Sequence, residues 1–336
     1  MRFPPVEDIS GLETRRFSIN TLDRQMHELV RDVRFAVTHS RHLIKRSREL
    51  ASSLDDLLLQ HQYTHRSMRL LLKVAYRESE YVIVADTASL AREQVEKIYQ
   101  AVILCQGPRK WMRQYLRSRW QKDYERYLLE IDEYSGIKRF RNHLYNRYPP
   151  FLEGMRRNKL RRKEIRLVSD FAIRVIEYDW HTRKATKPTP KPVWFNRKGS
   201  IRSFLRAYFY FPTPWDVMTK TRKRTLYVFL DRWYREYKSL SEYSHVLMGK
   251  VIAQRANRDK SFKASQRAAV YGQKEAGAFI LMSHIAIASL CTIIMSHLGN
   301  DYGTKRTTRE YWNELNKRSL LAKAFWKLYA EETLTD

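Results

Sequence analysis

The chain has 336 residues, of which 43% are hydrophobic, so it can bury a sizeable core and is not a disordered tail. Only 10 glycines and 10 prolines occur, which argues against an all-β protein rich in tight turns. The 64 Lys and Arg residues outnumber the 36 Asp and Glu residues, giving a formal net charge of +28 at pH 7. We therefore expect a polyanionic partner: nucleic acid, ribosomes or an anionic membrane surface.

The cysteines and the N-terminus bear on the cellular compartment. Cys105 and Cys291 lie in apolar runs and cannot form a disulfide framework, so both are predicted to be small buried side chains. This usage fits a reducing cytoplasm. The first eight residues lack the apolar core of a signal peptide. We therefore expect a cytoplasmic protein.

Apolar residues recur at steps of three and four along most of the chain, which predicts helices. The run over 20–60 predicts one long amphipathic N-terminal helix, capped by Asn20 or Thr21. The prolines of 183–200 predict a surface loop, or a sub-domain boundary. Further helical runs are expected at about 61–81, 82–105, 109–134, 151–182, 201–210, 214–255 with a break near Lys220, 262–298 and 308–331.

Residues 276–298 form the most apolar stretch and are nearly long enough to span a bilayer. Ser283, His284 and His297 interrupt this stretch, and the centre of a large bundle also requires a helix that is apolar on every side. We favour a buried helix without membrane insertion. The predicted fold is all-α: a large helical bundle, a single domain over 1–336, with a long N-terminal amphipathic helix and a buried apolar helix near 276–298.

A basic and aromatic region covers 180–230, with twelve Lys or Arg residues and one acidic residue, Asp216. Cations for phosphates and rings for base stacking are the composition that single-stranded nucleic acid prefers. The alternative is a solvated positive loop whose rings face the core. The candidate binding residues, including two from a second basic segment over 109–166, are Arg183, Lys184, Arg197, Lys198, Arg202, Arg206, Lys220, Arg222, Lys223, Arg224, Arg113 and Arg117.

Residues 233–245 are the candidate for chemistry, because helical spacing places Tyr237, Ser241 and His245 on one face. A histidine beside a hydroxyl and a carboxylate can act as a general acid or base. The alternative is a histidine packed against a neighbouring helix. Arg92 and Glu96 form a spacing-four pair in an otherwise apolar helix, and we expect His245 or Tyr237 to supply their partner. The alternative is an ion pair on the helix surface.

These residues also carry a resemblance. Arg-x-x-x-Glu in an apolar helix, then Tyr-x-x-Leu-Ser-x-x-x-His and a long apolar helix, resembles a helical bacterial domain family of unknown function over roughly residues 60–300. That family is associated with HEPN-type, defence-linked domains, so the resemblance implies a bacterial defence or stress role. In HEPN ribonucleases an Arg holds phosphate and a His, a short spacer later, handles protons. Arg34…His39 and Arg174…His181 match that spacing, as chance alone predicts, and His245 departs from it.

Metal ligation has only weak support in the sequence. His61 and His65 are four residues apart and share a helix face, and Glu242-x-x-His245 is half of a di-metal signature whose second half is absent. There is no P-loop, Rossmann glycine fingerprint or nucleophile elbow. We therefore expect no metal site and no cofactor.

Together these features predict a basic helical protein that binds RNA or single strands without sequence specificity. A protein partner or a homo-oligomer is compatible with this prediction. The first alternative is a metal-independent HEPN-like ribonuclease, with His245 as acid and base, Arg92 on phosphate and Glu96 as an orienting group, so catalysis is left open. The second alternative is peripheral attachment to an anionic membrane.

Overall fold

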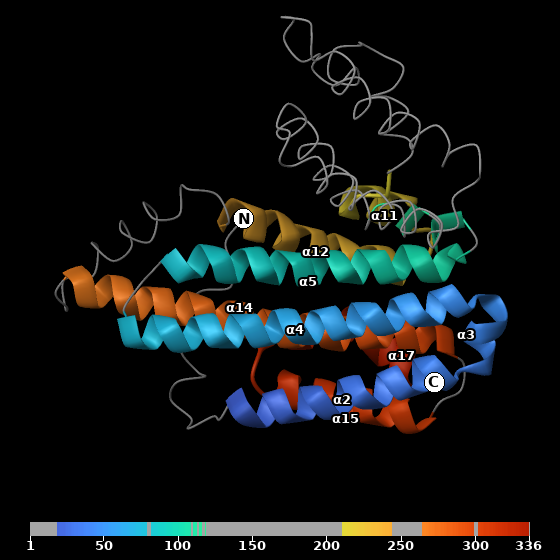
Figure 1. The fold of residues 1–336 in the computed structure, drawn as a ribbon, viewed down its shortest axis with the longest axis horizontal. Coiled ribbons are helices and arrows are strands. Elements are labelled where there is room, and N and C mark those ends of the chain that lie inside the picture. Colours follow the sequence, from blue (N-terminus) through green and yellow to red (C-terminus); the bar gives the residue numbers. More distant parts are fainter. Residues whose placement is uncertain are drawn as a thin grey trace, which may run out of the picture. The chain divides into compact units, whose positions relative to one another are not determined.

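The computed structural model describes residues 19–78, 82–108, 110–112, 114, 115, 118, 210–243, 264–298 and 302–335. These residues are helical almost throughout and contain no strand, which confirms the all-α prediction (Figure 1). The helices are α2 (Ile19–His39), α3 (Arg41–Arg46), α4 (Arg48–Glu78), α5 (Val82–Gln106), α11 (Pro214–Lys220), α12 (Arg224–Tyr243), α14 (Ala264–Leu298), α15 (Tyr302–Asn316), α16 (Leu320–Phe325), the π-helix η2 (Trp326–Ala330) and α17 (Glu331–Thr335).

Contacts divide the chain into two compact units, residues 1–108 with 212–336, and residues 109–211. All of the helices above belong to the first unit, and the description that follows concerns that unit. The single domain over 1–336 stays a prediction. The proline-rich segment 183–200 lies outside the described residues.

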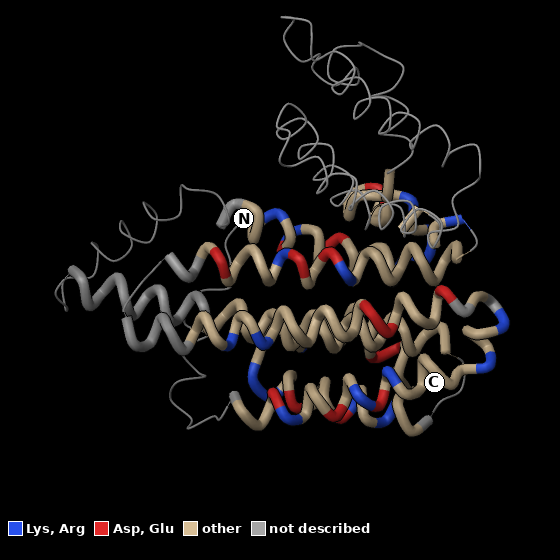
Figure 2. The backbone as a smooth tube through the Cα atoms, in the orientation of Figure 1, with Lys and Arg blue, Asp and Glu red and all other residues tan. Residues whose placement is uncertain are grey.

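The first unit is layered, with α4 and α14 between the pair α5 and α12 and the pair α2 and α15 (Figure 1). Helix α14 contacts α5, α4, α2 and α15, so it is covered on several sides. Its stretch Gly277–Leu298 is long and apolar enough to cross a membrane, and 89% of its most apolar window is buried inside the protein. Residues 277–298 contain no Asp, Glu, Lys or Arg, whereas Figure 2 shows charged residues on the outer helices of the bundle. The predicted buried apolar helix is confirmed.

The predicted N-terminal helix over 20–60 is broken at two serines. Ser40 is extended and its side chain accepts a hydrogen bond from the Leu43 amide, so it ends α2 and begins the short α3. Ser47 is extended as well, and its Oγ accepts from the Leu50 amide at the start of α4. The chain therefore turns back on itself, and α2 packs against α4 instead of continuing into it. The second half of the predicted helix belongs to α4, which continues to Glu78.

Other boundaries follow local capping. The break near Lys220 lies where predicted, between α11 and α12, and Thr213 forms a capping box with Asp216 at the start of α11. The run expected over 308–331 is interrupted before Ser319, whose Oγ accepts from the Ala322 amide. Cys105 and Cys291 are fully buried, as predicted.

Candidate functional site

The predicted site lies where α12 packs on α5. Leu226, Leu230, Trp233 and Leu240 recur at helical spacing and are buried, which fixes the face that α12 turns to the bundle. Tyr99 of α5 donates from its hydroxyl to the Leu230 carbonyl over 2.7 Å, so the two helices are also joined by a buried hydrogen bond. Trp233, at the start of the predicted stretch, is a core residue that stacks on Phe325 at 4.2 Å between ring centroids.

Arg92, Glu96 and Tyr237 come together at the edge of this contact. The Tyr237 hydroxyl donates to Glu96 Oε1 over 3.1 Å, and Arg92 Nε lies 3.8 Å from the same oxygen. Tyr237 is thus the partner that the sequence predicted for the pair. The side chains of Arg92 and Glu96 are about one-third exposed. Burial and the Glu96 carboxylate raise the pKa of Tyr237, so its phenol stays protonated at neutral pH.

The other two predicted residues have different positions. Ser241 Oγ donates to the Tyr237 carbonyl one turn earlier over 3.0 Å. His245 lies outside the described residues. The described part of the group therefore offers a guanidinium on a side chain that is about one-third exposed and can bind a phosphate, together with a phenol–carboxylate pair. Its catalytic role stays a prediction.

A surface strip on α11 and α12 adjoins this group, and we call it the aromatic–basic strip. Trp215 is 52% exposed and contacts the Tyr234 ring at 5.3 Å, and Tyr234 stacks on Tyr237 at 6.1 Å between centroids. The Lys238 ammonium lies 5.2 Å from the centre of the Tyr234 ring. The rings form a series that leads to the Arg92–Glu96 pair.

Four predicted binding residues lie at the turn that joins α11 to α12, and we count this turn as part of the strip because the same two helices carry the rings. Lys220, Arg222, Lys223 and Arg224 are all exposed. Lys223 pairs with Glu332 over 3.0 Å, whereas no acidic side chain of the described residues pairs with the other three. The remaining candidates lie outside the described residues: Arg113, Arg117, Arg183, Lys184, Arg197, Lys198, Arg202 and Arg206.

A second polar group lies inside the bundle and was not predicted. Asp23 of α2, His65 of α4 and His284 of α14 direct one carboxylate oxygen and two ring nitrogens toward a common point, all within 4.8 Å of one another. His65 Nε2 lies 3.0 Å and His284 Nε2 lies 3.3 Å from Asp23 Oδ1. The two rings meet edge to face at 4.5 Å. Both histidines are buried, while the Asp23 side chain is 20% exposed.

A further polar contact orients each member of this histidine–aspartate group. His65 Nδ1 lies 2.7 Å from Ser283 Oγ, and His284 Nδ1 lies 2.6 Å from the Tyr311 hydroxyl. Arg69 Nε donates to Asp23 Oδ2 over 2.9 Å. These contacts fix the ring orientations and leave Asp23 Oδ1 facing the two Nε2 atoms.

The electrostatics of the group keep Asp23 charged and His284 neutral. Burial acts to raise the pKa of Asp23, but contacts with His284 and His65 outweigh it and hold the pKa well below its usual range. Burial lowers the pKa of His284 to about 4, so its ring is neutral at pH 7. Burial, with a smaller effect of the Lys97 charge, lowers the pKa of the neighbouring His61 well below normal.

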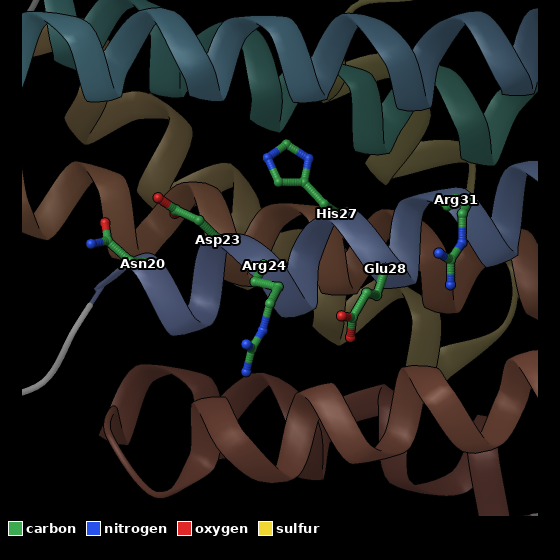
Figure 3. Close-up of a pocket in the computed structure, with 6 residues that line it drawn as sticks. All are labelled: Asn20, Asp23, Arg24, His27, Glu28 and Arg31. Carbon is green, nitrogen blue, oxygen red and sulfur yellow. The ribbon is translucent and has the colours of Figure 1, made fainter.

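A shallow pocket of about 450 Å³ opens beside Asp23 along α2. Asp23 and His27 point to one side of the helix, and Arg24 and Glu28 point to the other (Figure 3). Asp23 thus connects the buried histidines to the surface.

Part of this group was visible in the sequence. The spacing of His61 and His65 indicated a shared face, but His61 Nε2 lies 3.0 Å from the Ser283 carbonyl and does not face Asp23. Ser283 and His284 were noted as polar interruptions of the apolar stretch. In the sequence, these two residues and His65 were the only indication of a buried polar group. The packing of α14 against α4 is what brings them into contact.

The fold and these two groups define an all-α bundle with an aromatic–basic surface strip and a buried histidine–aspartate group. No family model, no curated protein and no solved structure matches the chain. The resemblance to HEPN-type domains stays a hypothesis.

Proposed function

We propose that the protein binds RNA or single-stranded nucleic acid, without sequence specificity, through the aromatic–basic strip. The observation that carries this proposal is the series of rings from Trp215 to Tyr237, which shares its two helices with four exposed cations at 220–224. Rings stack on any base and cations contact phosphates, so the combination is tolerant of sequence. The net charge of +28 supports the same partner.

The charge of the strip supports attraction of a phosphate chain in particular. Lys220, Arg222 and Arg224 have no acidic partner among the described residues, so their charges are available at the surface. A cytoplasmic location and a role in bacterial defence or stress belong to this proposal, the latter through the HEPN-type resemblance.

The charge contribution is tested by fluorescence anisotropy with labelled single-stranded RNA, single-stranded DNA and duplex DNA over a series of salt concentrations. Replacing Lys220, Arg222 and Arg224 by Gln is expected to weaken binding and to flatten the plot of log K against log salt by about 2, because each single-strand phosphate contact contributes about 0.7. The matched control replaces Arg309, Lys323 and Lys327, three other exposed cations, by Gln. Equal losses in both triple variants, or wild-type binding that is insensitive to salt, contradict the proposal.

The stacking contribution is tested with Trp215→Ala. Loss of one stacked base is expected to weaken binding by about 1–3 kcal/mol, with little change in the salt slope. Phe35→Ala is the control, because Phe35 is 66% exposed and lies on α2, away from the strip. If both variants bind RNA like the wild type, the rings of the strip are not a stacking surface.

A second candidate function is metal-independent ribonuclease activity, favoured by the contact of Tyr237 with Glu96 beside Arg92. In this hypothesis Arg92 holds a phosphate and His245 transfers protons. Wild-type protein with EDTA is expected to cleave labelled RNA, His245→Ala to lose cleavage, and Arg92→Ala to cleave more slowly. Arg235→Ala is the control, because Arg235 is exposed and pairs with Asp231 on the same helix as Tyr237. RNA that stays intact with the wild type, or is cut equally by His245→Ala, removes this candidate.

A further inference from the structure

The buried histidine–aspartate group has the donor set of a metal site, and its two oxygen–nitrogen separations match one. Asp23 Oδ1, His65 Nε2 and His284 Nε2 lie within 4.8 Å of one another, with 3.0 and 3.3 Å between the oxygen and the two nitrogens. Metal–ligand bonds of about 2.0–2.2 Å place neighbouring ligand atoms about 3.0–3.5 Å apart. The two oxygen–nitrogen separations fall in that range, and the two nitrogens, which lie within 4.8 Å of each other, would move closer together around an ion.

The atoms behind these ligands have the arrangement that a metal-binding histidine requires. A ligating imidazole needs one nitrogen free and the other fixed by a hydrogen-bond partner. Ser283 Oγ holds Nδ1 of His65, and the Tyr311 hydroxyl holds Nδ1 of His284, so both Nε2 atoms face inward. Arg69 Nε holds Oδ2 of Asp23, and Oδ1 makes a hydrogen bond with His65 Nε2 that an ion between the two atoms would replace.

An unsatisfied atom points independently to a ligand. His284 Nε2 is fully buried and has no hydrogen-bond partner, although it lies 3.3 Å from Asp23 Oδ1. Buried polar atoms almost always have a partner, so an orphaned ring nitrogen calls for an explanation. A cation between Asp23, His65 and His284 would satisfy this atom.

We propose that Asp23, His65 and His284 bind one divalent first-row transition-metal ion such as Zn²⁺ or Fe²⁺. Two imidazole nitrogens and one carboxylate oxygen suit these ions, whereas Mg²⁺ and Ca²⁺ prefer oxygen ligands alone. Three protein ligands leave at least one coordination position for water. Asp23 lines the pocket on α2 and its side chain is 20% exposed, so it is the ligand nearest the surface (Figure 3).

The ion would join three helices that are distant in the sequence. Its ligands come from α2, α4 and α14, one from each, so binding would connect the central helix α14 to both α2 and α4. Because the unfolded chain holds no such arrangement, binding is coupled to folding and raises the unfolding temperature.

Binding is measured on protein stripped with EDTA and dialysed, by titration with Zn²⁺ in competition with a chromophoric chelator, and with Co²⁺ followed by its visible absorption. The expected result is one tight equivalent, a Co²⁺ spectrum that Zn²⁺ abolishes, and a higher unfolding temperature with Zn²⁺. His284→Ala and Asp23→Asn are expected to lose this site. Tyr311→Phe, which retains all three ligands, is expected to weaken it by about 10–100-fold.

Two controls separate ligation from general damage. Thr292→Val removes a buried hydrogen bond from the same helix, and His39→Ala removes an exposed histidine, so both should bind one equivalent. Absence of stoichiometric binding in the folded wild type overturns the proposal and leaves the group as a hydrogen-bonded link between helices. Binding that persists unchanged in folded Tyr311→Phe and Asp23→Asn overturns it as well. All measurements are made without nucleic acid, so failure here is distinct from failure of the proposed function.

Discussion

The ammonium group of Lys97 donates to Thr64 Oγ1 over 3.2 Å, which joins α5 to α4 inside the bundle. Lys97 is only 6% exposed. Burial lowers its pKa to about 8, although the nearby carboxylates of Glu93 and Glu96 act in the opposite direction. A charge is therefore held in the interior with incomplete compensation.

Lys97→Met is expected to stabilise the protein at pH 7. The folded pKa of about 8 lies below the usual 10.5, so the buried charge destabilises the fold below pH 8, and this effect disappears as the pH rises from 8 to 10.5. The shift corresponds to at most about 3 kcal/mol. Urea denaturation across this pH range should show that the difference in free energy of unfolding between Lys97→Met and the wild type becomes smaller as the pH rises. Lys220→Met is the exposed control, and a difference independent of pH contradicts the prediction.

Glu236 should show the opposite pH dependence. Burial raises its pKa above the usual 4.5, although Arg232 opposes the shift from 3.1 Å away. The carboxylate therefore destabilises the fold at neutral pH, and this effect disappears as the pH falls through the raised pKa toward 4.5. Glu236→Gln is expected to be more stable than the wild type at pH 7, with a gain that narrows on acidification. Glu310→Gln, at an exposed position, serves as the control. A stability gain of Glu236→Gln that becomes larger as the pH falls would refute the argument.

The helices were predictable where apolar residues continued without a break, by their period in α5 and as one long apolar run in α14. The break of the N-terminal run was not, because Leu43 and Leu50 continue the period through the turn and both are buried. A serine inside a periodic run is read as an exposed helix position, whereas Ser40 and Ser47 act as N-caps. Only the packing of α2 on α4 favours the turn over continuation.

The group of Arg92, Glu96 and Tyr237 could be predicted from the sequence, whereas the histidine–aspartate group could not. Arg92 and Glu96 were found because a charged pair in an apolar helix needs a partner, and the face of α12 that carries Tyr237 was defined by its period. His284 sits in a helix that is apolar all round, so no period shows which neighbour it faces. His65 and Ser283 are 218 positions apart, and only the tertiary fold brings them into contact.

The N-cap role of Ser47 predicts a measurable loss of stability. Ser47→Ala removes the acceptor of the Leu50 amide and is expected to lower the free energy of unfolding by about 1 kcal/mol. Ser52→Ala is the control, because Ser52 is an exposed interior position of α4, where Ala is neutral or slightly favourable. Equal effects of the two substitutions in urea denaturation would show that Ser47 does not cap the helix.

The hydroxyl of Thr292 predicts how strongly α14 is tied to α15. It accepts from the Trp312 indole nitrogen over 2.9 Å and donates to the Ala288 carbonyl, and Trp312 is fully buried. Thr292→Val keeps the shape but leaves the indole N–H unpaired, so it should lower the free energy of unfolding by about 1–3 kcal/mol. Thr292→Ser retains the hydroxyl and should lose less stability.

A double-mutant cycle of Thr292→Val with Trp312→Phe, which removes the donor, tests this hydrogen bond directly. The two losses of stability should be less than additive, because the buried N–H that Val leaves unpaired is then absent. Strict additivity would mean that this hydrogen bond contributes nothing to the packing of the central helix.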